Sequence, residues 1–172
     1  MKKSTPAYAP ILKLPFLGAT EYIELNGQQI PAKIDTGADS SSIWASDVSV
    51  NASGQLEFKL FASTSPFYTG EVLHADDFKI SKIRSSNGQA EYRYRTHLSI
   101  ILHGKRIRVL FSLSNRSKNQ FPVLIGRRTI KNKFLVDVSK SSIPPSKQEL
   151  SPKPTGAKNH QRQLKQKGDQ RS

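Results

Sequence analysis

The chain reads Ala32-Lys33-Ile34-Asp35-Thr36-Gly37-Ala38-Asp39-Ser40 at the stretch that decides its fold. Residues of strand character lead into a tight turn that begins at Asp35. Gly37 lets the backbone come close to another group and adopt unusual φ and ψ angles, while Thr36 places a hydroxyl group beside the Asp35 carboxylate. Small residues on both sides of the turn leave room for a second copy of the same loop. Taken alone, however, the Asp-Thr-Gly tripeptide is more often an ordinary β-turn with an Asx hydrogen bond.

A carboxylate in such a turn can hydrolyse a peptide bond when a second carboxylate lies close to it. Two like charges at that distance cannot both ionise readily, so the pair shares a proton and its two pKa values separate. The ionised member can act as general base on a water molecule, and the protonated member can donate to the carbonyl oxygen. Asp35 is therefore a candidate catalytic residue, provided that the protein supplies its partner.

Each chain contributes one Asp-Thr-Gly run to such a pair. The other aspartates, none of which is followed by Thr-Gly or Ser-Gly, are Asp39, Asp47, Asp76, Asp77, Asp137 and Asp169. A chain of 172 residues is also too small for two full lobes. The pair therefore requires a homodimer with twofold symmetry, with Asp35 of each subunit on the axis.

A second motif, Val123-Leu124-Ile125-Gly126-Arg127, lies further along the chain, ahead of a short helical stretch at 127–132. The two motifs, in this order, resemble the signature of the retroviral-type aspartic peptidases, the retropepsins. The resemblance implies that the apolar strand crosses behind the active-site loop and supports it. The expected supporting residues are Leu124, Ile125, Gly126 and Arg127. It also implies that Thr36, Gly37 and Ala38 serve the geometry of the loop and of the dimer, whereas Asp35 is catalytic.

The match is closer to a bacterial subset, the retropepsin-like proteins once labelled putative ATP-dependent zinc proteases. Further runs carry it: Leu14-Pro15, Arg84-Ser85-Ser86-Asn87-Gly88, Glu91 with Arg93, and Phe134-Leu135-Val136-Asp137. The resemblance covers about residues 12–140 and implies an enzyme that needs no cofactor. The zinc of the old label finds no ligand set, because the chain has no cysteine and its four histidines form no His-Glu-x-x-His pair.

Retropepsins cover their substrate with a glycine-bearing hairpin between the two motifs. The candidate flap is Arg84-Ser85-Ser86-Asn87-Gly88, since Asn87-Gly88 is a strong signal for a tight hairpin turn. A plain surface hairpin explains these residues equally well. Beside the second motif, Arg127 is expected to pair with an acidic residue near the dimer interface, and Asp39 is a possible partner.

The remaining sequence favours short strands separated by turns. Alternating apolar residues and turn pairs such as Asn26-Gly27 are typical of a closed β-barrel or a sandwich. The expected strands are 22–25, 29–34, 56–60, 78–83, 91–102, 106–111, 121–125 and 134–138. With the resemblance, the prediction is an all-β, retropepsin-like closed barrel with one short C-terminal helix, acting as a homodimer.

Three regions are expected: a flexible N-terminal segment (1–10), the retropepsin-like domain (11–140) and a disordered basic tail (141–172). The tail is rich in Lys, Gln, Ser and Pro with almost no aliphatic residues, so it cannot bury enough apolar surface to offset its ordering entropy. No apolar run approaches the roughly 18 residues of a membrane span, and no apolar region follows Lys2-Lys3 as in a signal peptide. A cytoplasmic protein without membrane contact is expected.

The net charge of +14 can attract anionic partners. Nucleic acid is nevertheless not an expected partner, because no known nucleic-acid motif accompanies Arg93 and Arg95, and a solvated strand face explains these arginines more simply.

Three functions fit this pattern. The first is an aspartic endopeptidase acting on a peptide or protein substrate. The second is a non-catalytic module of the same fold that dimerises or captures peptides. The third follows from the association of the resembled family with ATP-grasp peptide ligases, and is the trimming or binding of acidic, glutamate-type peptides.

Overall fold

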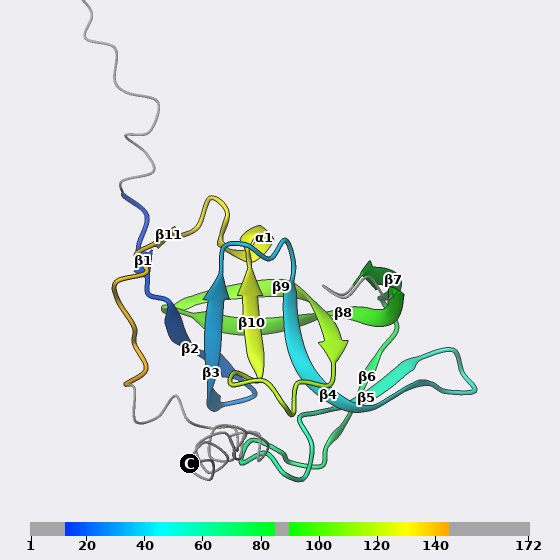
Figure 1. Cartoon of the computed structure of the whole chain (residues 1–172). Helices are drawn as coiled ribbons and strands as arrows, with labels where there is room; N and C mark the ends of the chain where they lie inside the picture. Colours follow the sequence, from blue (N-terminus) through cyan, green and yellow to red (C-terminus); the bar gives the residue numbers. More distant parts are fainter. Residues whose placement is uncertain (1–12, 85–89, 145–172) are drawn as a thin grey trace, which may run out of the picture.

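The structure, a computed structural model, describes residues 13–84 and 90–144 (Figure 1). Strands make up almost all of its regular structure. In chain order the elements are β1 (Phe16–Leu17), β2 (Thr20–Leu25), β3 (Gln28–Asp35), β4 (Ser41–Val50), β5 (Leu56–Leu60), β6 (Val72–Ala75), β7 (Phe78–Arg84), β8 (Ala90–Leu102), β9 (Lys105–Ser114), β10 (Val123–Gly126), α1 (Arg127–Ile130) and β11 (Leu135–Val136).

Six of these strands close into a barrel. Around the ring they follow the order β10, β3, β2, β8, β9 and β4, and β4 pairs with β10 to complete the circle. β10 runs parallel to β3 and antiparallel to β4, and β4 runs parallel to β9. The expectation of a mostly-β closed barrel with one short helix is confirmed.

Two tight hairpins set the register of the barrel. Asn26 and Gly27 connect β2 to β3, and His103 and Gly104 connect β8 to β9; all four residues have positive φ, between 49° and 76°. Two successive residues of positive φ form the turn whose twist matches that of paired strands. The alternation of the flanking strands then directs one face inward.

The interior of the barrel is apolar and closely filled. Fully buried side chains come from each of the six barrel strands, and include Ile23, Ile30, Ile43, Ile100, Phe111 and Ile125. Burial of a side chain of this size contributes about 1.5–3 kcal/mol to folding. The barrel is thus a rigid base for the loops at its ends.

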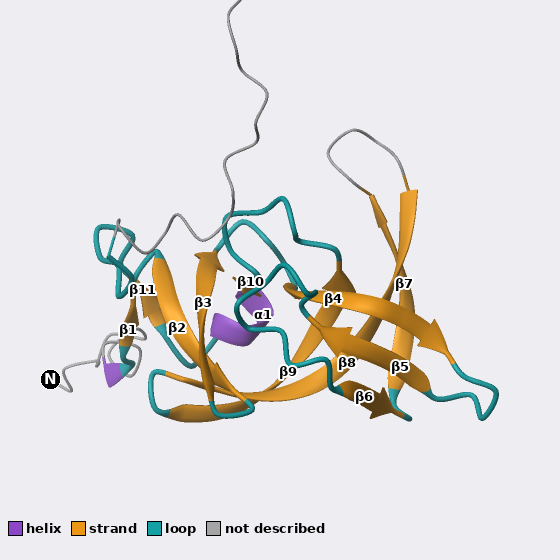
Figure 2. Ribbon diagram, turned by 90° about the horizontal axis from the view of Figure 1, so that it is seen from below, coloured by secondary structure: helices purple, strands orange, loops and turns teal. Residues whose placement is uncertain are grey.

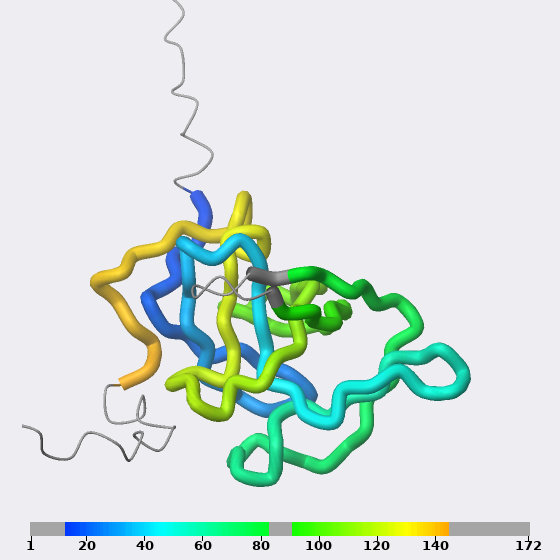
Figure 3. The backbone as a smooth tube through the Cα atoms, turned by 45° about the vertical axis from the view of Figure 1, so that its right-hand side comes forward, coloured from blue at the N-terminus to red at the C-terminus, as the bar shows by residue number. Residues whose placement is uncertain are grey.

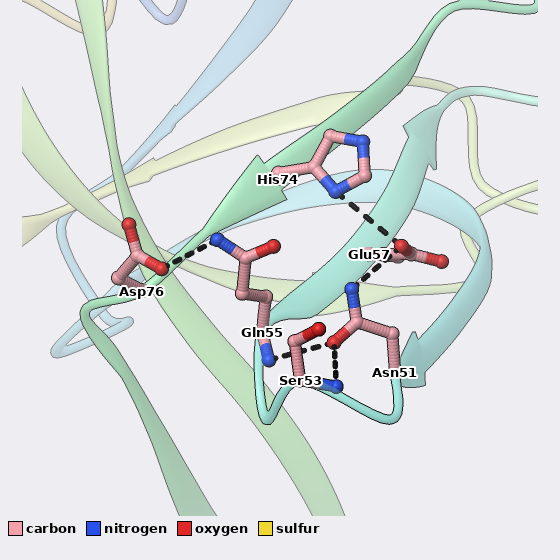
Figure 4. A network of polar contacts seen from close by, with 6 residues as sticks. All are labelled: Asn51, Ser53, Gln55, Glu57, His74 and Asp76. Atoms are coloured by element: carbon pink, nitrogen blue, oxygen red, sulfur yellow. Dashed lines mark hydrogen bonds and ion pairs between the residues drawn. The ribbon is translucent and has the colours of Figure 1, made fainter.

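The segment between β4 and β7 projects from the barrel as an arm formed by β5, β6 and their connections (Figure 3). A polar network at its tip fixes the turn into β5 (Figure 4). Asn51 accepts hydrogen bonds from the amides of Ser53 and Gln55 and donates to Glu57, which lies 3.4 Å from His74 Nδ1. Gln55 donates to Asp76.

β1 and β11 lie at the opposite end of the molecule from the arm (Figure 2), and the end of the described chain packs on that side (Figure 1). The Ser142 amide donates to the Thr20 carbonyl, the Ser142 hydroxyl donates to Glu21, and Ile143 is fully buried. The folded part therefore extends beyond the boundary expected at residue 140. Composition alone concealed this, because the segment reads as polar up to the Pro144-Pro145 pair.

In the part of the chain that the structure describes, no helix is long and apolar enough to cross a membrane.

Candidate active site

Asp35 is the last residue of β3 and stands at one end of the barrel, half-buried. Its Oδ1 atom accepts hydrogen bonds from the amides of Gly37 and Ala38, at 3.0 and 3.1 Å. A Cβ atom at Gly37 would lie 3.2 Å from the same oxygen. The loop thus holds the carboxylate by its own backbone and keeps crowding side chains away from it.

β10 supports this loop from behind. Gly126 pairs with Asp35 in the parallel register of β10 and β3. A Cβ atom at Gly126 would come within 2.6 Å of the Ser40 carbonyl group and 3.0 Å of the Ala38 carbonyl oxygen, so only glycine lets the two segments approach. Just beyond, the Arg127 amide donates to Ala38 and the Arg128 amide to Asp39.

A buried hydroxyl pair locks the base of the loop to α1. The Ser41 and Thr129 hydroxyls lie 2.8 Å apart, and the Ser41 oxygen also accepts the Gly126 amide at 3.1 Å. Neutral hydrogen bonds of this kind hold position because an unpaired buried group would be costly.

Asp39 forms ion pairs with two arginines, at 3.6 Å to Arg127 and 2.7 Å to Arg128. All three side chains are exposed, so the pairs add little stability. They border a hollow of about 560 Å³ that Thr36 also lines. Arg127 and Asp39 therefore do meet, and Arg128 is the closer partner of the two arginines.

A family model described as "RimB-like: Retropepsin-like aspartic endopeptidase RimB" matches residues 16–147. The chain belongs to the RimB-like family. This confirms the retropepsin-like resemblance read from the Asp35 and Gly126 motifs.

Two relatives are probable alpha-L-glutamate ligases, from Shewanella pealeana and Shewanella halifaxensis. They are 30% and 31% identical to the chain over 135 residues, which is 73% of this chain and 29% of each relative. The chain thus spans less than a third of the length of these curated relatives. A crystal structure of a protein of unknown function from Legionella pneumophila matches 74% of this chain and 95% of its own, with 26% identity and a TM-score of 0.60.

The candidate flap of this RimB-like chain lies only partly within the described residues. β7 and β8 pair antiparallel from Phe78–Thr96 to Arg84–Ala90, so the two strands of the expected hairpin are present. Ser85, Ser86, Asn87 and Gly88 lie outside the described residues. Their role as a flap stays a prediction.

Arg116 is a site residue that sequence reasoning missed. It follows β9, its Nε atom donates to the Phe121 carbonyl at 3.1 Å, and it is largely buried. Burial lowers the pKa of its guanidinium group, the nearby Arg93 cation lowers it further, and the Asp35 carboxylate opposes both. In this RimB-like chain, Arg116 therefore lies near both the Arg93 cation and the Asp35 carboxylate. No local pattern around Arg116 signals this, because Asp35, Arg93 and Arg116 come from distant segments.

Within the described residues, no group of three His, Asp or Glu side chains could hold a metal ion. Two histidines of the described region lie beside single carboxylates: His97 is 3.4 Å from Asp77, and His74 is 3.4 Å from Glu57.

Proposed function

We propose that the chain is one subunit of an aspartic endopeptidase whose two Asp35 carboxylates, one from each subunit, activate a water molecule. The observation that carries this proposal is the fixed, half-buried Asp35 carboxylate at the end of β3, held by two loop amides and supported by Gly126. Membership of the RimB-like family supports the same chemistry.

The reaction follows from the shared proton. The ionised Asp35 takes a proton from water while the oxygen of that water attacks the peptide carbonyl carbon, and the protonated Asp35 of the other subunit donates to the carbonyl oxygen. Transfer of a proton to the peptide nitrogen then lets the carbon–nitrogen bond break, which yields a carboxyl group and an amine. Neither a cofactor nor a covalent intermediate takes part.

The homodimer belongs to this proposal because one chain offers one Asp-Thr-Gly run. Thr36 and Gly37 are exposed beside Asp35, and the hollow lined by Thr36, Asp39 and Arg127 adjoins them. We expect these surfaces to face the partner subunit across the twofold axis. A monomer should be inactive.

The experiment compares the purified protein with Asp35→Asn on a diverse peptide library from acid to neutral pH, with cleavage read by mass spectrometry. Cleavage by the native form alone is expected, together with a dimer in sedimentation under the active conditions. Cleavage by Asp35→Asn at the native rate would end the proposal. Peptide binding without cleavage at any pH would favour the non-catalytic module.

A second candidate is action on acidic peptides, in company with a peptide ligase. Two observations favour it: Arg116 lies near Asp35, and the two curated relatives are named probable alpha-L-glutamate ligases. A carboxylate side chain of the substrate would find the Arg116 guanidinium group there. Peptides that end in a run of glutamates, compared with the same peptides ending in glutamines, test this candidate; equal cleavage or binding of both would contradict it.

A further inference from the structure

β9 lies between β8 and β4 for only part of their length. Its pairing with β8 ends at Arg95–Ser112, and its pairing with β4 ends at Trp44–Ser114. β9 itself ends at Ser114, whereas β8 reaches back to Ala90 and β4 continues to Val50. The space that β9 would occupy, if it continued, is left open between the two strands.

A cavity of about 700 Å³ fills that space. Consecutive residues of both strands line it, namely Trp44–Val48 of β4 and Glu91–Tyr94 of β8, and Leu113, Ser114 and Asn115 close one end. Successive residues of a strand point to opposite faces of a sheet. A cavity that touches four or five residues in a row therefore lies along the edge of the strand, and we call this cavity the edge slot.

Within residues 13–84 and 90–144, no strand pairs with the backbone groups along the edge slot. Residues 91–94 of β8 pair with β7 on their other edge, and no described strand pairs with them on the slot side. On β4, both the amide and the carbonyl of Trp44 are bonded away from β9, to Pro122 and Phe61. β5 thus follows the edge of β4 that is opposite to β9, and no described strand covers the slot edge from residue 45 onward. An open strand edge is a template for another extended chain.

The two edges are not equivalent. Asp47 has a positive φ of 52°, and the pairing of β4 with β5 shifts register between Ser46 and Ser49. Such a bulge twists a strand away from a regular partner. The longer regular edge is therefore that of β8, where four residues offer about 13 Å of strand at ~3.3 Å per residue.

We propose that the edge slot binds an extended segment of the substrate polypeptide as an added strand beside residues 91–94 of β8. This inference rests on the proposed peptidase function and adds to it a binding site away from the scissile bond. Continuity with the candidate active site indicates the substrate as occupant. Arg116 directly follows Asn115 at the end of the slot. Its guanidinium group lies close enough to both Arg93, in the slot, and Asp35 to interact with their charges.

Recognition in the slot is mainly through the main chain. The charged side chains at its wall already have partners, since Arg93 is bonded to Glu91 at 2.7 Å and Asp47 to Lys59 at 2.9 Å. Neither pair leaves an uncompensated charge for a ligand. The slot therefore distinguishes long, unfolded chains from short peptides rather than one sequence from another.

The test uses two neighbouring exposed residues of the turn at 62–65. Thr64 lines the slot and Ser63 does not, so Thr64→Tyr places a ring in the slot while Ser63→Tyr is the matched control. Hydrogen exchange is measured on the full chain carrying Asp35→Asn, with and without a pool of fourteen-residue peptides of random sequence. Peptide should protect amides in segments 45–48 and 91–94 from exchange. With Thr64→Tyr, the peptide concentration that gives half of this protection should rise about tenfold, whereas Ser63→Tyr should leave it unchanged.

With Asp35 intact, the same pool is compared with an eight-residue pool. We expect a higher kcat/KM for the long pool than for the short pool. Thr64→Tyr should bring the ratio of these two kcat/KM values toward one, whereas Ser63→Tyr should not change it. Protection without any cleavage would retain the slot and overturn the peptidase proposal. Cleavage with no protection, and no effect of Thr64→Tyr on the ratio, would overturn the slot alone. Protection already present without peptide would assign the slot to this chain's own segments or, if it depended on protein concentration, to a second copy; either result overturns the proposal.

Discussion

Gly126 and Asp35 stand side by side at the ends of two parallel strands, and the glycine is the reason why the active-site loop can fold over β10. The position of a Cβ atom at Gly126 is 2.6 Å from both the carbon and the oxygen of the Ser40 carbonyl. These are backbone atoms in a loop that two further amides, those of Arg127 and Arg128, tie down. The loop cannot retreat without breaking those bonds.

Gly126→Ala adds only one methyl group, but it should lower the stability of the fold and disturb the active-site loop. Overpacking against a fixed backbone costs about 1–3 kcal/mol, and any relief would move the loop that orients Asp35. We expect a lower midpoint in urea unfolding together with loss of peptide cleavage. Gly104→Asn is the control, because Gly104 has open space around its Cβ position and its φ of 74° is tolerated by asparagine. Equal stability of the two variants would contradict this account.

The hydrogen bonds of the Ser41 and Thr129 hydroxyls predict that Ser41→Ala destabilises the protein more than Thr129→Val. Ser41→Ala removes the acceptor of the buried Gly126 amide and leaves that donor unpaired, at a cost of about 1–3 kcal/mol. Thr129→Val keeps the shape and leaves Ser41 free to accept the amide, so its effect should be smaller. Urea unfolding of both variants measures the difference. A larger loss for Thr129→Val would show that the Ser41–Gly126 bond is not the important one.

Local signals in the sequence were sufficient for the hairpins, the helix and the candidate catalytic loop. Asn26-Gly27 and His103-Gly104 are residue pairs that favour the positive φ angles they adopt in the two hairpin turns. The Asp35 and Gly126 motifs lie side by side, as the family resemblance implied. β4 was not predicted as a strand. Its first five residues, Ser41–Ala45, are all buried, and Ser41 and Ser42 carry hydroxyls that pair with Thr129 of α1 and Ser114 of the neighbouring β9. The start of the strand therefore lacks the alternation of apolar and polar residues that signals a strand.

Features that depend on distant segments could not be read. Arg116 looks like any surface arginine until the barrel brings it near Asp35 and Arg93. Ile143 is a single apolar residue in a polar stretch, and its burial depends on the surface that β1 and β2 offer.

Truncation distinguishes the packed end of the chain from the tail. A chain ending at residue 144 should unfold at the same temperature as the full chain, whereas one ending at residue 140 loses Ile143 and the Ser142 bonds to Thr20 and Glu21. Loss of a buried aliphatic side chain of this size costs about 2–5 kcal/mol. Thermal unfolding of the two chains measures it. If both chains unfold alike, the segment 141–143 does not contribute to the fold.

Glu91, near the start of β8, should make the stability of the protein depend on pH. Its hydrogen bond to Arg93 lowers the pKa of Glu91 below the ordinary value of 4.5. A lowered folded-state pKa contributes stability at pH values above the ordinary pKa, and that stability is lost as the pH falls through the folded value. Because the side chain is 56% exposed, the effect should be small. Glu91→Gln should lower the melting temperature at pH 7, and the difference from the native protein should shrink below pH 4.5. A difference that grew with acidity would reverse the sign of this argument.

Mixing native chains with Asp35→Asn tests whether one active site uses two chains. Asparagine can still accept the amides of Gly37 and Ala38 through its oxygen, so the variant should keep its fold and exchange subunits normally. A mixed dimer holds one carboxylate and cannot share a proton, and it should be inactive. After exchange in an equal mixture, about one dimer in four keeps both carboxylates, so activity per native chain should fall to about half. A matched mixture with Ser63→Tyr should retain full activity, since Ser63 lies on the arm, in the connection between β5 and β6. Undiminished activity in the Asp35→Asn mixture, with exchange verified by mass spectrometry of intact dimers, would show that a single chain suffices for catalysis.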